Sequence, residues 1–110
     1  MAEGAVEVND GNFEQEVEGT PGLVLLDMGA EWCPPCKTLE PIIEALAGEM
    51  AGKVKVCTLD VGEGPQTAAR FGVLNIPTMI FFKNGEEAER LIGFVPKAEI
   101  MKVIDRLTGS

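Results

Sequence analysis

The sequence predicts an α/β domain in which a mixed sheet carries helices on both of its faces. An apolar run at Leu23–Leu26 has the pattern of a strand that is buried on both sides in a parallel sheet. An amphipathic segment from Leu39 to Met50 and a second strand over residues 53–61 follow it, which together predict a right-handed parallel crossover. Nearer the end of the chain, Asn84-Gly85 stands between two strand-like segments and predicts an antiparallel hairpin.

The elements that precede the hairpin are shorter. Residues 5–8 alternate weakly in polarity and predict a first strand. Asp10-Gly11-Asn12 can cap a short helix over residues 13–17. After the second predicted strand, Gly62-Glu63-Gly64-Pro65 opens a short helical segment that ends near residues 71–72.

The last elements complete the sheet and cover it. A third apolar strand is predicted at Met79–Phe82, and residues 88–93 return antiparallel to it. Pro96 can occupy the first turn of a closing helix, because a first-turn amide has no partner within the helix. In the long helix, Pro41 interrupts the hydrogen-bond ladder, so a kink is predicted there. The apolar faces of these two helices comprise Leu39, Ile42, Ile43, Leu46, Ala47 and Met50, and Ile100, Ile104 and Leu107.

Length and charge restrict the class of protein. The 110 residues are expected to form one domain over residues 1–110, and the 45% apolar content is too high for a disordered chain. A formal charge of −9 repels phosphates and anionic headgroups, so we expect protein or peptide partners, no nucleic acid and no membrane. The start of the chain has no signal-peptide pattern and no run reaches the roughly 18 apolar residues of a membrane span, which favours a cytoplasmic location. The protein is expected to be a monomer.

The most informative motif is Trp32-Cys33-Pro34-Pro35-Cys36, which places two thiols at the junction of a strand and a helix. Helix N-terminal amides there can hold Cys33 as a thiolate, and the spacing brings Cys36 to the same face to resolve a mixed disulfide. Pro34 and Pro35 are tolerated in a first turn, and the Cys36 amide stays available as a donor. With no histidine in the chain, imidazole catalysis and His-containing zinc sites are excluded. The motif therefore predicts dithiol redox chemistry.

An ordered series of landmarks extends this motif from about Val6 to Leu107. The series comprises Asp27, Ala30-Glu31-Trp32-Cys33, Pro35-Cys36-Lys37, Pro41, Ile76-Pro77-Thr78, Phe82-Lys83-Asn84-Gly85 and Gly93. In this order the chain resembles the thioredoxin family. The resemblance implies a fold of five strands and four helices, reduction of protein disulfides, recharging by a thioredoxin reductase of the flavoprotein class, and no cofactor beyond the redox-active cysteine pair.

The resemblance also implies roles for single residues. Cys33 would be the nucleophile, Cys36 the resolving thiol and Asp27 the buried carboxylate that accepts a proton beneath them. The substrate groove would be bordered by Trp32, Pro34, Ile76, Pro77, Gly93 and Phe94, with Pro77 in the cis form and with Pro35 and Pro41 as structural residues. The chain differs from the family at Pro34, where glycine is usual, at Met28-Gly29 in place of an aromatic pair, and at Thr58 in place of a lysine.

Several of these residues have an alternative interpretation. Asp27 stands in an apolar strand, where burial should raise its pKa, but it could instead be exposed at the strand end. If it is buried, the Thr58 hydroxyl could replace the missing lysine as its partner. Trp32 could be an exposed apolar lip or a core residue, and Phe94 could be either. Cys57, in an apolar strand, is expected to be inert.

Three other functions stay open at this point. A binding or assembly subunit can share the same fold without catalysis. A disulfide oxidase or isomerase would use the same cysteine pair. A metal or iron–sulfur site using Cys33, Cys36 and Cys57 would be short of a fourth ligand.

Overall fold

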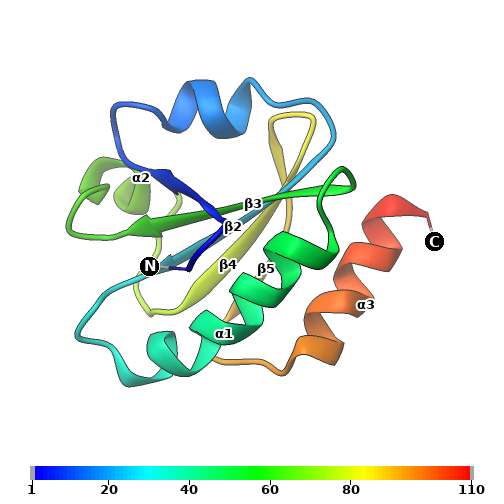
Figure 1. Cartoon of the computed structure of the whole chain (residues 1–110). Coiled ribbons are helices and arrows are strands. Elements are labelled where there is room, and N and C mark those ends of the chain that lie inside the picture. Colours follow the sequence, from blue (N-terminus) through cyan, green and yellow to red (C-terminus); the bar gives the residue numbers. More distant parts are fainter. Residues whose placement is uncertain (1, 110) are drawn as a thin grey trace.

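The structure, a computed structural model, describes residues 2–109 and contains one five-stranded sheet with helices on both faces (Figure 1). The strand order is β1-β3-β2-β4-β5, in which β1, β3 and β2 are parallel while β4 and β5 are antiparallel to their neighbours. The predicted mixed sheet is therefore confirmed. The elements are β1 (Val6–Val8), a short π-helical segment η1 (Glu14–Glu18), β2 (Leu23–Gly29), α1 (Pro34–Glu49), β3 (Val54–Asp60), α2 (Pro65–Arg70), β4 (Thr78–Lys83), β5 (Glu86–Ile92) and α3 (Lys97–Thr108).

Strand β2 lies at the centre of the sheet, and all seven of its residues are buried. Because side chains alternate along a strand, β2 contributes to two separate cores. Leu23 and Leu25 pack with α1 and α3 on one face, while Val24 and Leu26 pack with η1 and α2 on the other. Figure 1 shows α1 and α3 together on one side of the sheet. A strand covered on both faces explains why its sequence is an unbroken apolar run.

The hairpin between β4 and β5 forms as its sequence predicts. Asn84 and Gly85 have positive φ values of 51° and 85°, which is the conformation that a two-residue turn requires. A Cβ atom on Gly85 would lie 2.6 Å from the backbone oxygen of Glu18, so this position also needs glycine for space. The hairpin makes β5 an edge strand, and its outer residues are largely exposed.

Two predicted helix starts differ from the structure. Asp10 does not cap η1, whose N-terminal flanking residue Phe13 makes no side-chain cap. Its carboxylate instead accepts hydrogen bonds from the backbone amides of Gln66 and Thr67 and from the Thr67 hydroxyl, at 2.8 to 3.0 Å, and so caps α2. Pro96 precedes α3 with extended backbone (ψ 158°) and is not in its first turn. A cap taken from a distant segment has no local signal, which is why sequence reasoning assigned Asp10 to the nearer helix.

Helix α1 is continuous through Pro41, and a kink there stays a prediction. The stripe that faces the core contains Leu39, Ile43 and Leu46, each fully buried. None of the described helices is both long enough and apolar enough to cross a bilayer.

Candidate functional site

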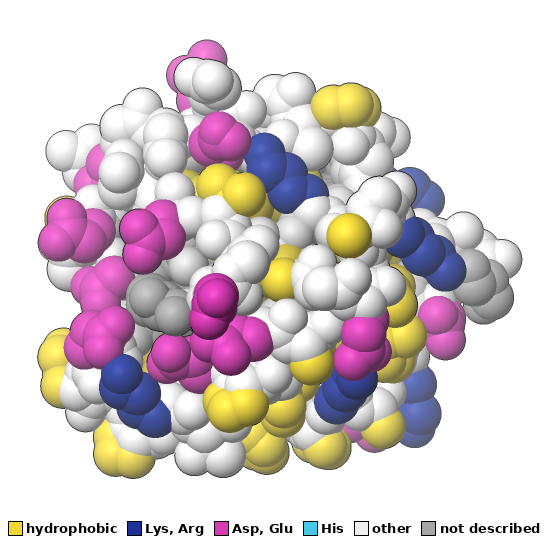
Figure 2. Space-filling model, in the orientation of Figure 1, with side chains coloured by type: hydrophobic (Ala, Val, Ile, Leu, Met, Phe, Trp, Pro, Cys, Tyr) yellow, Lys and Arg dark blue, Asp and Glu magenta, His cyan; other side chains and the backbone are white. Residues whose placement is uncertain are grey.

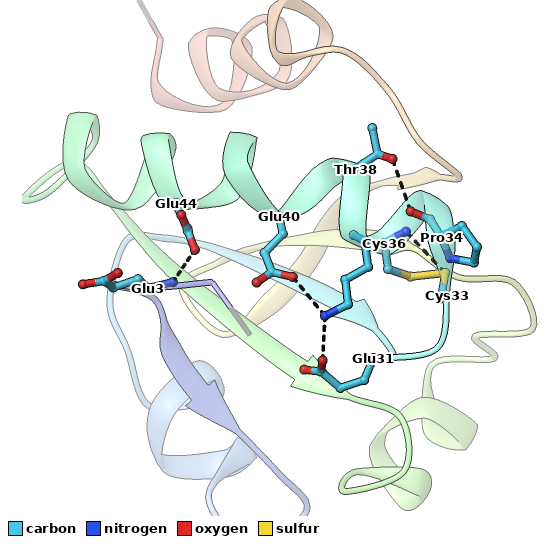
Figure 3. A network of polar contacts seen from close by, with 9 residues as sticks. Glu3, Glu31, Cys33, Pro34, Cys36, Thr38, Glu40 and Glu44 are labelled. Carbon is cyan, nitrogen blue, oxygen red and sulfur yellow. Dashed lines mark hydrogen bonds and ion pairs between the residues drawn. A yellow bond between two sulfur atoms is a disulfide. The ribbon is translucent and has the colours of Figure 1, made fainter.

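The two cysteines of the motif lie at the N-terminus of α1 and form a disulfide (Figure 3). Cys33 is the N-cap residue, with extended backbone, and the helix begins at Pro34. Cys36 follows one turn later, with its Cα atom 5.2 Å from that of Cys33. Prolines at the first two helical positions fit this arrangement because neither position needs an amide donor. The loop from β2 into α1 therefore brings both sulfur atoms to one face, as the sequence predicts.

The Cys33 sulfur receives the first free amide of the helix. The Cys36 N–H donates to Cys33 Sγ at 3.3 Å, and the carbonyl oxygen of Ile76 lies 3.8 Å from the same sulfur. The Ile76–Pro77 bond is cis, as the family resemblance implies. Ala30 packs with the two cysteines in a small apolar cluster that Ile76 also contacts. A donor amide at a helix N-terminus favours the thiolate over the thiol when the disulfide is reduced.

Asp27 is buried beneath this end of α1. Only 4% of its surface is exposed, and it lies two residues after Leu25 on the face of β2 that packs against α1. Burial, with a smaller contribution from the negative charge of Glu40 on α1, raises the pKa of Asp27 from 3.8 to about 7. The prediction of a buried carboxyl with a raised pKa is confirmed, and the exposed alternative is wrong.

The predicted hydrogen bond between Asp27 and Thr58 is absent. The two residues are paired across β2 and β3, and both are buried. Among residues 2–109, however, neither Asp27 Oδ1 nor Thr58 Oγ1 has a hydrogen-bond partner. The strand register brings the two backbones together without orienting the hydroxyl toward the carboxylate. The charge that acts on Asp27 is that of Glu40 on α1, which lies 3.9 Å from Lys37; Lys37 also contacts Glu31 at 2.7 Å (Figure 3).

Apolar side chains are exposed around the disulfide. Trp32 is 77% exposed, which excludes the core interpretation, and Phe94 is also exposed. Pro34 is exposed, Ile76 and Gly93 are half-buried, and Pro77 is buried.

Sequence reasoning missed two exposed apolar residues, Leu74 at 91% and Ile92 at 60%. Leu74 lies two residues before Ile76, and Ile92 ends β5 directly before Gly93. Neither residue carries a clear local signal, because Leu74 lies between Val73 and Ile76 in a mostly apolar loop and Ile92 directly follows Leu91 in β5.

Cys57 lies apart from the motif. It is fully buried in β3 among the apolar residues that face η1 and α2, and burial raises the pKa of its thiol to about 11. An inert role is therefore supported. Within residues 2–109, no three Cys, Asp or Glu side chains are arranged to hold a metal ion.

Comparisons with known proteins agree with this geometry. The thioredoxin family model matches residues 4–106. The thioredoxin of Staphylococcus haemolyticus is 45% identical over 101 residues, which cover 92% of this chain and 95% of that protein. The thioredoxin of Staphylococcus aureus is 43% identical over the same shares of both chains. The chain belongs to the thioredoxin family.

Membership in the thioredoxin family, together with the Cys33–Cys36 disulfide, identifies the chemistry. The protein is a thiol–disulfide oxidoreductase that acts as a protein-disulfide reductase. Membership in the family implies, in general, disulfide substrates and a reductase partner.

Proposed function

We propose that Cys33 attacks the disulfide of a protein substrate, that Cys36 resolves the resulting adduct and that Asp27 accepts the proton of Cys36. The observation that supports this proposal is the arrangement of the disulfide at the first turn of α1. There the Cys36 N–H donates a hydrogen bond to Cys33 Sγ, and the carboxyl of Asp27 is buried on the face of β2 that packs against α1. This arrangement combines a stabilised attacking sulfur, a second sulfur within bonding distance and a nearby base.

The first step forms a mixed disulfide. The Cys33 thiolate attacks one sulfur of the substrate disulfide, so a Cys33–substrate bond forms and the substrate's other sulfur leaves as a thiolate. In the second step Cys36 loses its proton and attacks Cys33 Sγ. The Cys33–Cys36 disulfide forms, the second substrate sulfur leaves, and two electrons have passed to the substrate.

Asp27 suits the second step because its pKa of about 7 leaves it able to accept or return a proton near neutral pH. A carboxyl with its usual pKa would be too weak a base. Its location on the face of β2 that packs against α1, close enough to Glu40 for that charge to raise its pKa, supports this role.

The exposed surface around the disulfide supports a role in holding substrate. Trp32, Pro34 and Phe94 expose apolar area beside the sulfurs, and we assign them to substrate contact together with Ile76, Pro77 and Gly93. Pro35 and Pro41 serve a structural role within α1.

The oxidised protein must be reduced again before it can act on another substrate. A thioredoxin reductase would return two electrons to Cys33–Cys36, so no cofactor beyond this cysteine pair is needed. A reducing compartment such as the cytoplasm is the natural setting, and the free Cys57 thiol is compatible with it. A monomer is proposed, and gel filtration with light scattering checks it.

Reduction of insulin by dithiothreitol tests the activity. The wild-type protein should accelerate the precipitation of insulin chains, and Cys33→Ser should abolish the acceleration because the attacking sulfur is lost. Cys57→Ser is the matched control, since it removes a thiol remote from the site, and it should keep the activity. Equal rates with and without the wild-type protein would refute the function.

Rapid-mixing kinetics test the role of Asp27. Asp27→Asn should slow the release of the mixed disulfide by about tenfold to a hundredfold while leaving its formation nearly unchanged, because only release requires the proton of Cys36 to be removed. Equal slowing of both steps would contradict the role as a base.

A further inference from the structure

An acidic cavity lies next to the loop that carries the cysteine motif, because Glu31 of that loop lines it. It has a volume of about 390 Å³, and Glu7, Glu31, Asp60 and Glu63 line it together with Thr58. No lysine or arginine lines it among the described residues. Figure 2 shows carboxylates gathered over the left half of the molecule with few basic side chains among them. In the orientation of Figure 1, this half contains the carboxyl ends of β2 and β3 and the start of α1.

The inner wall of the cavity contains an unsatisfied polar group. Glu7, Thr58 and Asp27 are paired across β1, β3 and β2, so their side chains form one row on the face that packs against α1. Glu7 is exposed, whereas Thr58 is 1% exposed and its Oγ1 has no hydrogen-bond partner among residues 2–109. A buried hydroxyl without a partner is costly, and Thr58 is one of the residues that line the acidic cavity.

The chemistry of the lining selects the class of ligand. A metal ion would need at least three converging ligands, and no such group exists among the described residues. The carboxylates instead surround the cavity, and one of them, Glu31, is already paired with Lys37. An ammonium on a flexible four-carbon stem fits better, because it can reach inward and has three donors for separated acceptors.

The cavity is close to the disulfide along the chain. Glu31 precedes Cys33 by two residues, and Asp60 is paired with Gly29 at the end of β2. A substrate whose disulfide lies against Cys33 can therefore reach this cavity with a long side chain that neighbours the disulfide. We propose that the cavity binds a lysine side chain of the protein substrate, next to the disulfide that Cys33 attacks. This inference rests on the proposed function and adds a preference for cationic substrates.

Peptide reduction tests the preference. The probes are synthetic peptides with one internal disulfide that differ only in a lysine or a glutamine, placed in turn at each position flanking the disulfide. Oxidation of the prereduced protein is followed by the fluorescence of Trp32, its single tryptophan. At low ionic strength, at least one lysine position should react about fivefold faster than its glutamine counterpart, which corresponds to roughly 1 kcal/mol for a partly exposed ion pair.

Variants distinguish a rate effect of the cavity from a rate effect of the overall negative charge of the protein. Thr58→Val and Glu63→Gln should each reduce the lysine-to-glutamine rate ratio toward one. Glu86→Gln is the matched control, because it removes one exposed carboxylate at the hairpin end of β5, and it should keep the ratio. Equal rates for the two peptides, or the same drop in ratio for Glu86→Gln as for Glu63→Gln, would overturn the inference. If neither peptide were reduced, the proposed function itself would fail.

Discussion

Asp27 illustrates how burial changes the chemistry of one residue. Asp27 is only 4% exposed, and its Oδ1 atom has no hydrogen-bond partner among residues 2–109. The charged form is therefore disfavoured, and Glu40 disfavours it further, which gives a pKa of about 7. The burial that raises the pKa of Asp27 and so makes it a stronger base also means that ionisation of Asp27 lowers the stability of the folded protein.

Asp27→Asn should therefore stabilise the oxidised protein at alkaline pH. The pKa of Asp27 is higher in the folded state, so the wild type loses stability as pH rises from about 4 to about 7 and gains none of it back above that range. At about pH 8 the variant should be more stable by up to about 4 kcal/mol, since the shift is about 3 pKa units at 1.36 kcal/mol each.

Guanidinium unfolding of both proteins at about pH 4 and about pH 8 measures the difference. Asp105→Asn on α3 is the control for the loss of one carboxylate. A variant that is no more stable than wild type at the higher pH would show that Asp27 ionises without cost.

At the scale of secondary-structure elements, the first turns of α1 and α2 differ in how their free backbone amides are used. The first turn of α1 contains Pro34 and Pro35 and leaves the Cys36 amide free for the Cys33 sulfur. The first turn of α2 receives its cap from Asp10, which is 56 residues before Gln66. The start of α1 is thus determined by neighbouring residues in the sequence, whereas the start of α2 depends on a contact with a distant segment.

Pro34→Gly should raise the reduction potential of the cysteine pair. Proline restricts the ring-opened dithiol more than the closed disulfide, so its removal favours the reduced form by about 1 kcal/mol, or about 20 mV for two electrons. Equilibration of both proteins with a glutathione buffer gives the two potentials. Equal potentials would mean that Pro34 does not influence the redox equilibrium.

Asp10→Ala should lower the Tm by a few degrees, because three donors of α2 lose their acceptor. Thermal unfolding followed by circular dichroism measures the change, and Asp10→Asn, which keeps an acceptor oxygen, should recover part of it. A Tm unchanged in the alanine variant would indicate that water replaces the cap.

The whole molecule combines two apolar cores with a strongly acidic surface. Clusters on both faces of the sheet hold the strands, while the net charge of −9 acts over the full surface. The ion pairs found among the described residues join side chains that are all more than a quarter exposed, and such pairs contribute little to stability. Repulsion between carboxylates is therefore only partly relieved.

Salt should stabilise this protein near neutral pH. Raising ionic strength from about 0.01 M to about 0.1 M shortens the Debye length from about 30 Å to about 10 Å, which screens the repulsion and should raise the Tm by a few degrees. Calorimetry at the two salt concentrations measures this effect. Near the sequence pI of 4.4 the gain should shrink. A Tm that falls with salt at neutral pH would show that attractive pairs outweigh the net charge.

Sequence reasoning located most of the fold and the motif, and two of its errors have a common cause. Leu23–Leu26, the Asn84-Gly85 turn and the cysteine spacing carry local patterns, and each was confirmed. Pro96, which precedes α3 instead of lying in its first turn, is a local error of one position. The other two wrong assignments concern contacts between distant segments. Asp10 caps another helix than predicted, and Thr58 faces Asp27 across the sheet without bonding to it.

By itself, the sequence determined the mixed sheet, the dithiol chemistry and the family, because periodicity, turn residues and the cysteine motif act over a few neighbouring positions. Only the tertiary structure decided that the Oδ1 atom of Asp27 has no hydrogen-bond partner among the described residues, that Glu40 adds to the raised pKa of this carboxyl and that carboxylates from three segments surround one cavity. The physical reason is that desolvation and Coulomb interactions depend on distance in space, which chain order does not specify.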